Sequence, residues 1–395
     1  MAGRARAPLL LALAGLTAGT LVNSYYAVAV TQRALGPGGG SVISHANGSS
    51  AFLYNFNAAY WTGVAPGAPD GLVLRVQNVT LTNQSVNKHS GIAAVRRLPG
   101  GAFERVDASR LIVRCPGMSV NGTPPAPTAD APCGDDPRVA WSAVLGKYIM
   151  TWQNVSDLVA HRVTHLATTA TPWDVASWEF HGPMLPGLGN TSGTSLLLRD
   201  DVPGSPHYAF TMQDDDAGHL TWATAPHDDP LSWTVGGPWI AGRPGHWDFN
   251  GLASGPQAER LSDGNYLYLY SIDNRRGCES AACGVCGVNC SAPGACPFCR
   301  IGRCSLGWVI LDGTDPLKVV ARAEEPIAFA ELPFETVGSP GAPTQTPFVI
   351  FTDGLQKVAP DEFVAWYGAG DTNVGAVRFK VVITHNTNSV VSELL

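Results

Sequence analysis

The chain has 395 residues, of which 45% are hydrophobic and 14% charged, and it contains 44 glycines and 30 prolines. This composition is sufficient for a sizeable core, and the many turn residues favour short strands over long helices. The net charge of −7 includes no run of lysine or arginine, which argues against nucleic acid or an anionic membrane surface as a partner.

Residues 1–24 have the form of a secretory signal. Arg4 and Arg6 precede an apolar run from Leu9 to Val22 that contains small residues near its end, as signal peptides do. Apolar residues resume from Tyr25 to Val30, so an uncleaved signal anchor is the alternative. Both interpretations predict a protein that is secreted or lies in the lumen of the secretory pathway, with membrane contact only through an uncleaved anchor.

Seven Asn-X-Ser/Thr sequons agree with that location, because such sites are glycosylated on the surface of secretory proteins. They lie at Asn47, Asn78, Asn83, Asn121, Asn154, Asn190 and Asn289.

The nine cysteines also fit an oxidising compartment. Cys115 and Cys133 bracket a loop rich in proline, alanine and threonine, and we expect them to pair. The other seven lie within 27 residues, at Cys278, Cys283, Cys286, Cys290, Cys296, Cys299 and Cys304. Two Cys-X-X-Cys pairs among them have zinc-ribbon spacing, but a disulfide-bonded insertion is favoured outside the cytosol. We therefore expect no metal and no cofactor; the connectivity stays open, and the odd count leaves one cysteine over.

A repeated pattern predicts the fold. Ala167-Thr168 is followed by a turn and Trp178, and Ala223-Thr224, 56 residues later, is followed by a turn and Trp233. Weaker copies lie at 91–95, 306–310 and 374–377. Five such units predict an all-β, five-bladed β-propeller, whereas the alternative, a β-sandwich, would not require the repeated register. We expect one domain over residues 46–385, interrupted by the cysteine-rich insertion at 277–305, with both tryptophans packed between blades.

The segment Asp135-Asp136-Pro137-Arg138 stands before a predicted strand. Side chains of neighbouring strand residues point to opposite faces, so we expect only one of the two carboxylates to line a cavity. On its own the segment would be read as an acidic turn.

Further motifs follow in order between about residue 50 and residue 380. Residues 307–316 read GWVILDGTDP and residues 366–375 read WYGAGDTNVG. Trp247-Asp248 and then Gly255-Pro256 precede both motifs, and Glu335-Thr-Val-Gly338 lies between them. Together with the Asp-Asp-Pro-Arg segment, they resemble the motifs of glycoside hydrolase family 130.

The resemblance implies a five-bladed propeller that cleaves β-mannosides with inversion, by phosphorolysis or by hydrolysis, and therefore a glycan as the partner. It implies that Asp136 is the general acid that protonates the leaving oxygen. Residues at matching positions are candidates for sugar binding: Asn57, Arg75, Arg138, Asp248, Tyr367 and Asp371.

The chain departs from this family where phosphate would bind. No lysine occurs between Lys147 and Lys318, and the histidine expected after Tyr270 is replaced by Ser271. Arg162 is the one further candidate for a phosphate ligand. A phosphate dianion needs several charge-assisted partners, so this incomplete set favours water as the nucleophile.

A hydrolase needs a carboxylate base in addition to Asp136. The candidates are Glu259, Glu335, Asp248 and Asp273, and Glu259 occupies a region in which the family's phosphorylases carry no acid. Two alternatives remain: a phosphorylase with a rebuilt anion site, and a propeller that binds carbohydrate without catalysis, because a fold does not fix a function.

Overall fold

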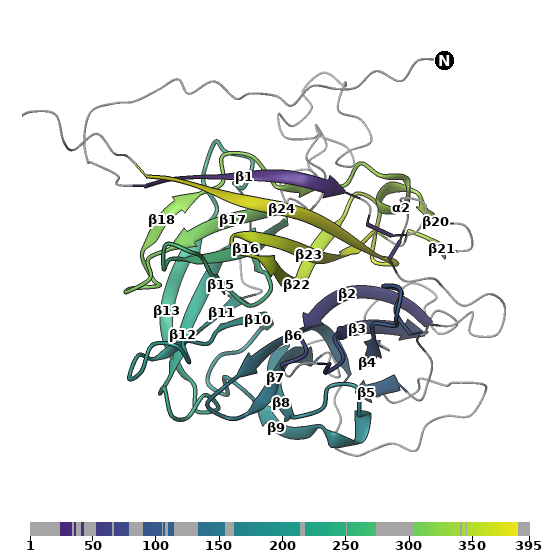
Figure 1. Ribbon diagram of the computed structural model, residues 1–395, viewed down its shortest axis with the longest axis horizontal. Coiled ribbons are helices and arrows are strands. Elements are labelled where there is room, and N and C mark those ends of the chain that lie inside the picture. The colour runs from purple at the N-terminus through teal and green to yellow at the C-terminus, as the bar shows by residue number, and fades with distance from the viewer. Residues whose placement is uncertain are drawn as a thin grey trace, which may run out of the picture.

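A computed structural model of the chain shows five β-sheets arranged around an axis (Figure 1). The structure describes residues 24–33, 35–36, 41–42, 53–64, 67–78, 90–104, 106, 110–113, 133–154, 162–213, 218–249, 251–273, 304–339, 342–344 and 346–385. The five-bladed propeller predicted from the repeat is thus confirmed, and the β-sandwich alternative is wrong.

Four blades follow one another along the chain. The first contains β2 (Leu53–Trp61), β3 (Gly71–Asn78), β4 (Ser90–Arg96) and β5 (Leu111–Val113). The second contains β6 (Gly134–Ser142), β7 (Lys147–Asn154), β8 (Val163–Thr169) and β9 (Glu179–Pro183). The third contains β10 (Thr191–Leu197), β11 (His207–Gln213), β12 (His219–Ala225) and β13 (Thr234–Ala241). The fourth contains β14 (Gly251–Ser254), β15 (Glu259–Arg260), β16 (Tyr266–Asp273), β17 (Ser305–Leu311), β18 (Val319–Arg322) and β19 (Ala328–Phe329).

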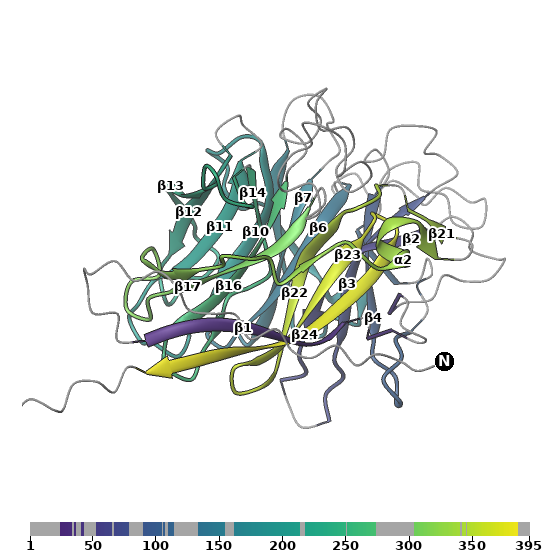
Figure 2. The same ribbon diagram turned by 90° about the horizontal axis from the view of Figure 1, so that it is seen from above.

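The fifth blade joins the two ends of the described chain. It consists of β22 (Ile350–Ala359), β23 (Glu362–Ala369), β24 (Asn373–His385) and, as its outer strand, β1 (Ser24–Arg33). Figures 1 and 2 both show β1 along β24, and the two strands pair antiparallel from Ser24 and His385 to Arg33 and Val377. The strand β1 therefore closes the ring, although it lies before residue 46, at which we expected the domain to start.

The sequence repeat corresponds to the third strand of each blade. The five copies fall on β4, β8, β12, β17 and β24, and the two tryptophans precede the outer strands β9 and β13. Trp178 is buried, as expected for a packing residue. Neighbouring first strands contact one another around the axis, from β14 through β10, β6 and β2 to β22.

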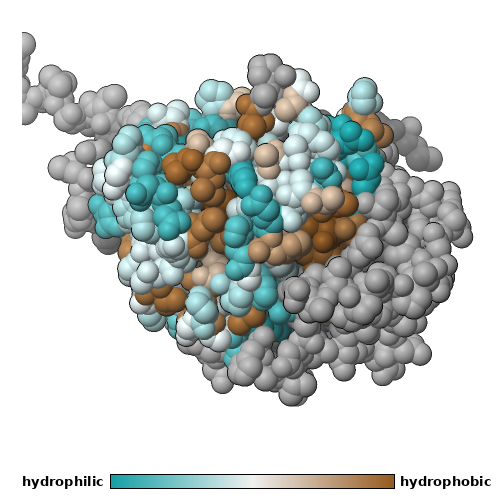
Figure 3. Space-filling view, turned by 90° about the horizontal axis from the view of Figure 1, so that it is seen from below, coloured by the Kyte–Doolittle hydropathy of each residue, from teal (hydrophilic) through white to brown (hydrophobic). Residues whose placement is uncertain are grey.

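The outermost strands of the second and third blades are the least buried. Every residue of β10 and β17 is buried, because neighbouring blades cover both faces of these strands, whereas the outer strands β9 and β13 are mostly exposed. On the face shown in Figure 3, hydrophobic residues form separate groups among hydrophilic ones, as is usual for a protein surface.

Two short elements link the last blades: the helix α2 (Pro333–Thr336) and the hairpin of β20 (Gly338–Ser339) and β21 (Ala342–Pro343). A 3₁₀ turn, η4 (Val175–Ser177), precedes β9. Within the described ranges, no helix is long and apolar enough to cross a membrane.

Part of the cysteine and sequon predictions lies outside the described residues. Cys133 is disulfide-bonded, but Cys115 and most of the predicted insertion are not described, and Cys304 is a buried thiol. Among the sequons, Asn190 is exposed, and the amide of Asn154 lies 3.2 Å from Nε2 of His165. The side chain of Asn78 and the sequons at Asn47, Asn83, Asn121 and Asn289 are outside the described part.

Ring closure rests partly on an ion pair from β1. Arg33 Nη2 lies 2.8 Å from Oε1 of Glu335, whose side chain is 0% exposed. We expect Arg33→Met to lower the free energy of unfolding by about 3 kcal/mol, because it leaves that carboxylate buried without its cation. Arg33 also contacts Glu331, which is 51% exposed, so the matched control Glu331→Gln should cost only about 0.5 kcal/mol or less. Urea denaturation of both variants measures this, and equal losses would contradict the assignment.

Candidate active site

A bulge at the start of β6 places two carboxylates on one cation. The pairing register shifts between Asp135 and Arg138, and Asp136 has a positive φ of 48°. Arg75 Nε lies 2.8 Å from Oδ1 of Asp135, and Nη1 lies 3.4 Å from Oδ1 of Asp136. Both carboxylates therefore approach one cation, because the bulge breaks the strand alternation that would direct them to opposite faces.

Arg75 reaches this position from β3, the second strand of the first blade. Its side chain is 7% exposed, and its Nε also donates to Oγ of Ser90 at 3.2 Å. The side chain of Asp135 is even more buried, at 4% exposed, whereas that of Asp136 is 16% exposed. Asp136 is thus the carboxylate of this pair that is open to a ligand.

Arg138 holds the blades together just below the two carboxylates. Its Nη1 donates to the carbonyl of Asp136 at 2.7 Å, while Nε and Nη2 donate to the carbonyls of Gly255 and Ser254 at 2.7 and 2.6 Å. Nη2 also lies 2.7 Å from Oδ1 of Asp353, which is 0% exposed. All three nitrogens are thus directed at protein acceptors, so Arg138 positions the backbone of Asp136 rather than holding a sugar.

Gly193 makes room for this guanidinium. A Cβ at Gly193 would lie 2.4 Å from Nη1 of Arg138, and φ there is 58°. The carbonyl of Gly193 also accepts from Oγ of Ser254 at 2.6 Å. Arg138 therefore contacts the third, fourth and fifth blades from its place in the second.

The same irregularity recurs in four first strands. The register shifts between Phe56 and Ala58 in β2, between Ser192 and Thr194 in β10, and between Thr352 and Gly354 in β22, as it does in β6. The bulges leave Asn57, Gly193 and Asp353 unmatched in their ladders. The side chain of Asn57 lies outside the described part, so its predicted sugar contact stays a prediction.

Asp371 and Arg162 complete the cluster. Asp371, at φ 53°, is half-buried, accepts from the hydroxyl of Thr346, and interacts electrostatically with Arg75. Arg162 Nη1 donates to Oγ of Ser192 at 3.5 Å, and its charge lowers the pKa of Asp135. Four of the predicted site residues, Asp136, Arg75, Arg138 and Asp371, are therefore brought together, with Arg162 beside them.

Burial controls the ionisation of the inner carboxylates. The pKa of Asp135 is raised to about 6. Burial is the largest cause, the charge of Arg75 opposes it, and the charge of Asp136 adds to it. Burial likewise raises the pKa of Asp353 well above its usual range, against the attraction of Arg138. The cluster therefore contains inner carboxyl groups that hold protons more tightly than ordinary aspartates.

Three predicted residues lie in other, buried networks. Glu335 accepts from the backbone nitrogens of Glu331 and Leu332 at 2.8 and 2.9 Å and from the hydroxyl of Tyr367 at 2.5 Å. Asp248, 0% exposed, lies 2.9 Å from Nε of Arg243 and 2.7 Å from Nη2 of Arg322. These contacts make Glu335, Tyr367 and Asp248 parts of the framework; the side chain of Asp273 is outside the described part.

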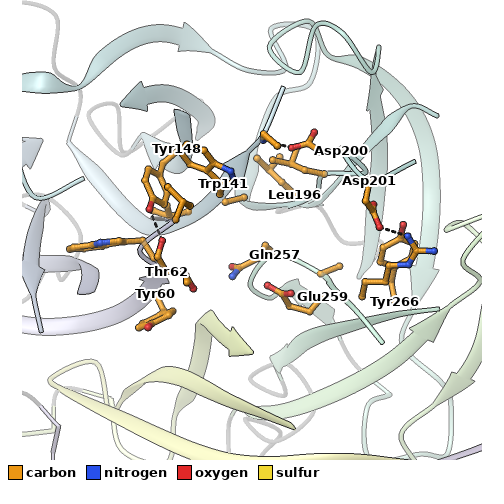
Figure 4. A pocket seen from close by; sticks show the side chains of 18 residues that line it. Tyr60, Thr62, Trp141, Tyr148, Leu196, Asp200, Asp201, Gln257, Glu259 and Tyr266 are labelled. Carbon is orange, nitrogen blue, oxygen red and sulfur yellow. Dashed lines mark hydrogen bonds and ion pairs between the residues drawn. The ribbon is translucent and has the colours of Figure 1, made fainter. Parts of the chain in front are cut away.

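Glu259 is also absent from the cluster around Asp136. It lines a separate cavity at the other end of the first strands, with Trp141 and Tyr148 (Figure 4). Burial raises the pKa of Glu259 to about 7, although the charge of Lys357 lowers it. The structure therefore does not bring Glu259, predicted as a candidate base, to the cluster around Asp136.

This pKa gives a prediction for stability. A raised pKa in the folded state means that the wild type loses stability as the pH rises from about 4.5 to about 7. Glu259→Gln removes this loss. Above pH 7 we therefore expect the free energy of unfolding of the variant to be about 2 kcal/mol larger than that of the wild type. Thermal melts between about pH 4.5 and about pH 8 test this. Glu179→Gln, at a carboxylate 61% exposed, serves as the control, and a pH-independent difference would contradict the assignment.

Several members of the cluster were not predicted from the sequence, namely Ser90, Gly193, Ser254 and Asp353. Asp353 is the one with a recognisable signal, because it is the single acidic residue of the first strand β22. No group of three or more His, Cys, Asp or Glu side chains in the described part of the chain could hold a metal ion.

Comparison with known proteins supports a relationship to enzymes of mannosides. No family model matches the chain. A β-1,2-mannobiose phosphorylase from Thermoanaerobacter sp. (strain X514) is 41% identical over 70 residues, which are 18% of this chain and 21% of that protein. A 1,2-β-oligomannan phosphorylase from the same organism is 27% identical over 241 residues, which are 61% of this chain and 66% of that protein. Both matches thus span less than two thirds of the relative's own length.

A solved structure extends the comparison over most of the fold. It comes from the family 130 mannoside phosphorylases, described as containing glycoside hydrolases that target β-1,2 mannosidic linkages in Candida mannan. It matches with a TM-score of 0.59 and 19% identity, covering 89% of this chain and 94% of that one. The resemblance to glycoside hydrolase family 130 is confirmed. At this identity the match to the family 130 structure shows the shared fold alone.

Proposed function

We propose that the protein cleaves β-mannosidic bonds with inversion, by hydrolysis, with Asp136 as the general acid. The observation that carries this proposal is the carboxylate of Asp136 near the start of β6, which is 16% exposed and lies beside Arg75, with its backbone held by Arg138. A positioned carboxylic acid that can protonate a leaving oxygen is the first requirement of glycoside cleavage. The relatives' activity on β-1,2-linked mannose supports mannosides as the substrate class.

The engagement of the arginines favours water over phosphate as the nucleophile. A phosphate dianion needs cationic donors that are not already used. Arg138 directs its nitrogens at protein acceptors, and Arg75 lies between two carboxylates. Arg162, the remaining basic group of the cluster, donates to the neutral hydroxyl of Ser192.

Among the carboxylates of the cluster, Asp371 is best placed to activate water. Asp353 is fully buried against Arg138, and Asp135 is buried against Arg75. Asp371 is half-buried and interacts with Arg75. We therefore propose Asp371 as the base of the hydrolytic reaction, in place of Glu259 and Glu335.

A product analysis tests the proposal. The full chain is incubated with β-1,2-mannobiose, with and without phosphate, and the products are followed by NMR. We expect free mannose, released first as the α anomer, independently of phosphate. For Asp371→Asn, azide should restore turnover and yield an α-mannosyl azide, because azide attacks without a base. Azide rescue fails if Asp371 only binds the sugar.

Phosphorolysis is the second candidate, favoured by the names of both sequence relatives. Phosphate-dependent formation of mannose 1-phosphate would establish it and would refute water as the nucleophile. Binding of mannobiose without any turnover would instead identify a propeller that only recognises sugar. The secreted or lumenal location also stays a proposal, which the signal-like residues 1–24 support and N-terminal sequencing of the protein from its source would test.

A further inference from the structure

A second cavity lies at the end of the axis opposite to the candidate active site. Asp136 is near the start of β6 and Trp141 is near its end, roughly 15 Å further at about 3.3 Å per residue. The cavity has a volume of about 430 Å³ and is lined by the ends of β2, β6 and β10 and by residues 257–260. This volume falls within the range of small-molecule sites in proteins.

Aromatic side chains form much of the wall. Trp141 and Tyr148 pack edge to face with ring centroids 4.9 Å apart, and Tyr60 and Tyr266 contribute from the first and fourth blades. In Figure 4, Gln257 and Glu259 extend from the fourth blade toward the middle of the cavity, across from Thr62 and Tyr60. A ligand in the cavity would therefore meet rings on one side and a carboxyl group on the other.

The charges of the wall are negative on balance. Arg260 is the one basic side chain among the lining residues, and it pairs with Asp201. This leaves Glu259 and Asp200 as the lining carboxylates that have no arginine partner in the described structure. Asp200 accepts from the backbone nitrogen of Ala143 and lies 3.7 Å from Nε2 of His207, whose pKa burial lowers. Lys357, on β22, is the other cation near Glu259, and its Nζ donates to the carbonyl of Arg260.

We propose that this cavity binds a small organic cation, with its ammonium group against Glu259 and its apolar body against Trp141 and Tyr148. An ammonium supplies the charge that the wall lacks, and aromatic faces attract cations further. An anion would be repelled by Glu259 and Asp200. A neutral ligand would leave the excess negative charge of the lining residues as it is. The site is separate from the proposed mannoside site and does not depend on that function.

Binding should also respond to pH. Glu259 is mostly protonated below pH 7 and ionised above it, so a cation should bind more tightly on the alkaline side. Asp200, Asp201, Arg260 and Lys357 are the other charged groups around the cavity. Measuring Glu259→Gln at the same pH values separates the contribution of Glu259 from that of these groups.

Binding of benzylammonium to the full chain, measured by calorimetry, tests the proposal, with benzyl alcohol as the neutral probe of the same shape. We expect binding about tenfold weaker at about pH 6 than at about pH 8, and about tenfold weaker for Glu259→Gln than for wild type at about pH 8. Glu179→Gln, at an exposed carboxylate, should bind as wild type does.

Three results would overturn the proposal: no heat from benzylammonium, equal binding by Glu259→Gln, or equal binding of benzyl alcohol. The thermal melts described for Glu259→Gln show separately whether that variant is folded. A binding signal from β-1,2-mannobiose that is lost in a cavity variant, Trp141→Ala, but kept in Asp136→Asn would assign the cavity to neutral sugar instead.

Discussion

Replacing Asp136 with asparagine should lower kcat for β-1,2-mannobiose by about 10³-fold, within the range that a general acid contributes. Asparagine has nearly the same shape and can accept the same hydrogen bond from Arg75, but it cannot give a proton to the leaving oxygen. The bulge that fixes Asp136 is held by its backbone carbonyl, which Arg138 binds at 2.7 Å, so the substitution should leave the fold intact.

The leaving group separates acid catalysis from mere positioning. An aryl β-mannoside with an acidic phenol as leaving group needs little protonation, so Asp136→Asn should cleave it nearly as fast as wild type does in the bond-breaking step. If Asp136 only oriented the sugar, both substrates would lose the same factor. Asp135→Asn is the matched control: its carboxylate is 4% exposed, and we expect it to affect both substrates alike, through Arg75.

The fold could be predicted from the sequence because it depends on a repeat. One pattern marks the third strand of all five blades, and the tryptophans before β9 and β13 follow from it. The closing strand β1 could not be predicted in this way, because Tyr25 to Val30 read as a continuation of an apolar leader. Its partner β24 lies more than 340 residues away, and such a pairing leaves no local signal.

The site was predicted only in part, for a different reason. Asp136, Arg75, Arg138 and Asp371 come from motifs, and the structure brings them together. Their roles depend on bulges, which bring Asp135 and Asp136 to Arg75 and bring Asp353 to Arg138. A bulge is a one-residue shift between two strands, so no spacing within a single strand reveals it. Likewise, Glu335 has partners on β1 and β23, and Asp248 has one on β18, each distant in the sequence.

Arg138 shows how stability and chemistry meet at the axis. We expect Arg138→Met to lower the free energy of unfolding by about 4 kcal/mol, because Asp353 would stay buried without its cation. The carbonyls of Ser254 and Gly255 would lose a donor as well. Urea denaturation measures this loss of stability. At a temperature at which the variant is folded, kcat should fall too, because the backbone carbonyl of Asp136 is no longer held by Arg138.

A double variant distinguishes the ion pair from the other contacts. Adding Asp353→Asn to Arg138→Met removes the uncompensated charge, so the double variant should regain about 2 kcal/mol of the lost stability. Its activity should stay low, because the carbonyl of Asp136 is still unheld. Recovery of stability and activity together would mean that Arg138 acts on Asp136 only through the charge of Asp353. No recovery of stability would mean that Asp353 is already neutral in the wild type, as the upward shift of its pKa by burial permits. In that case the backbone carbonyls of the second and fourth blades, rather than an ion pair, are what Arg138 stabilises.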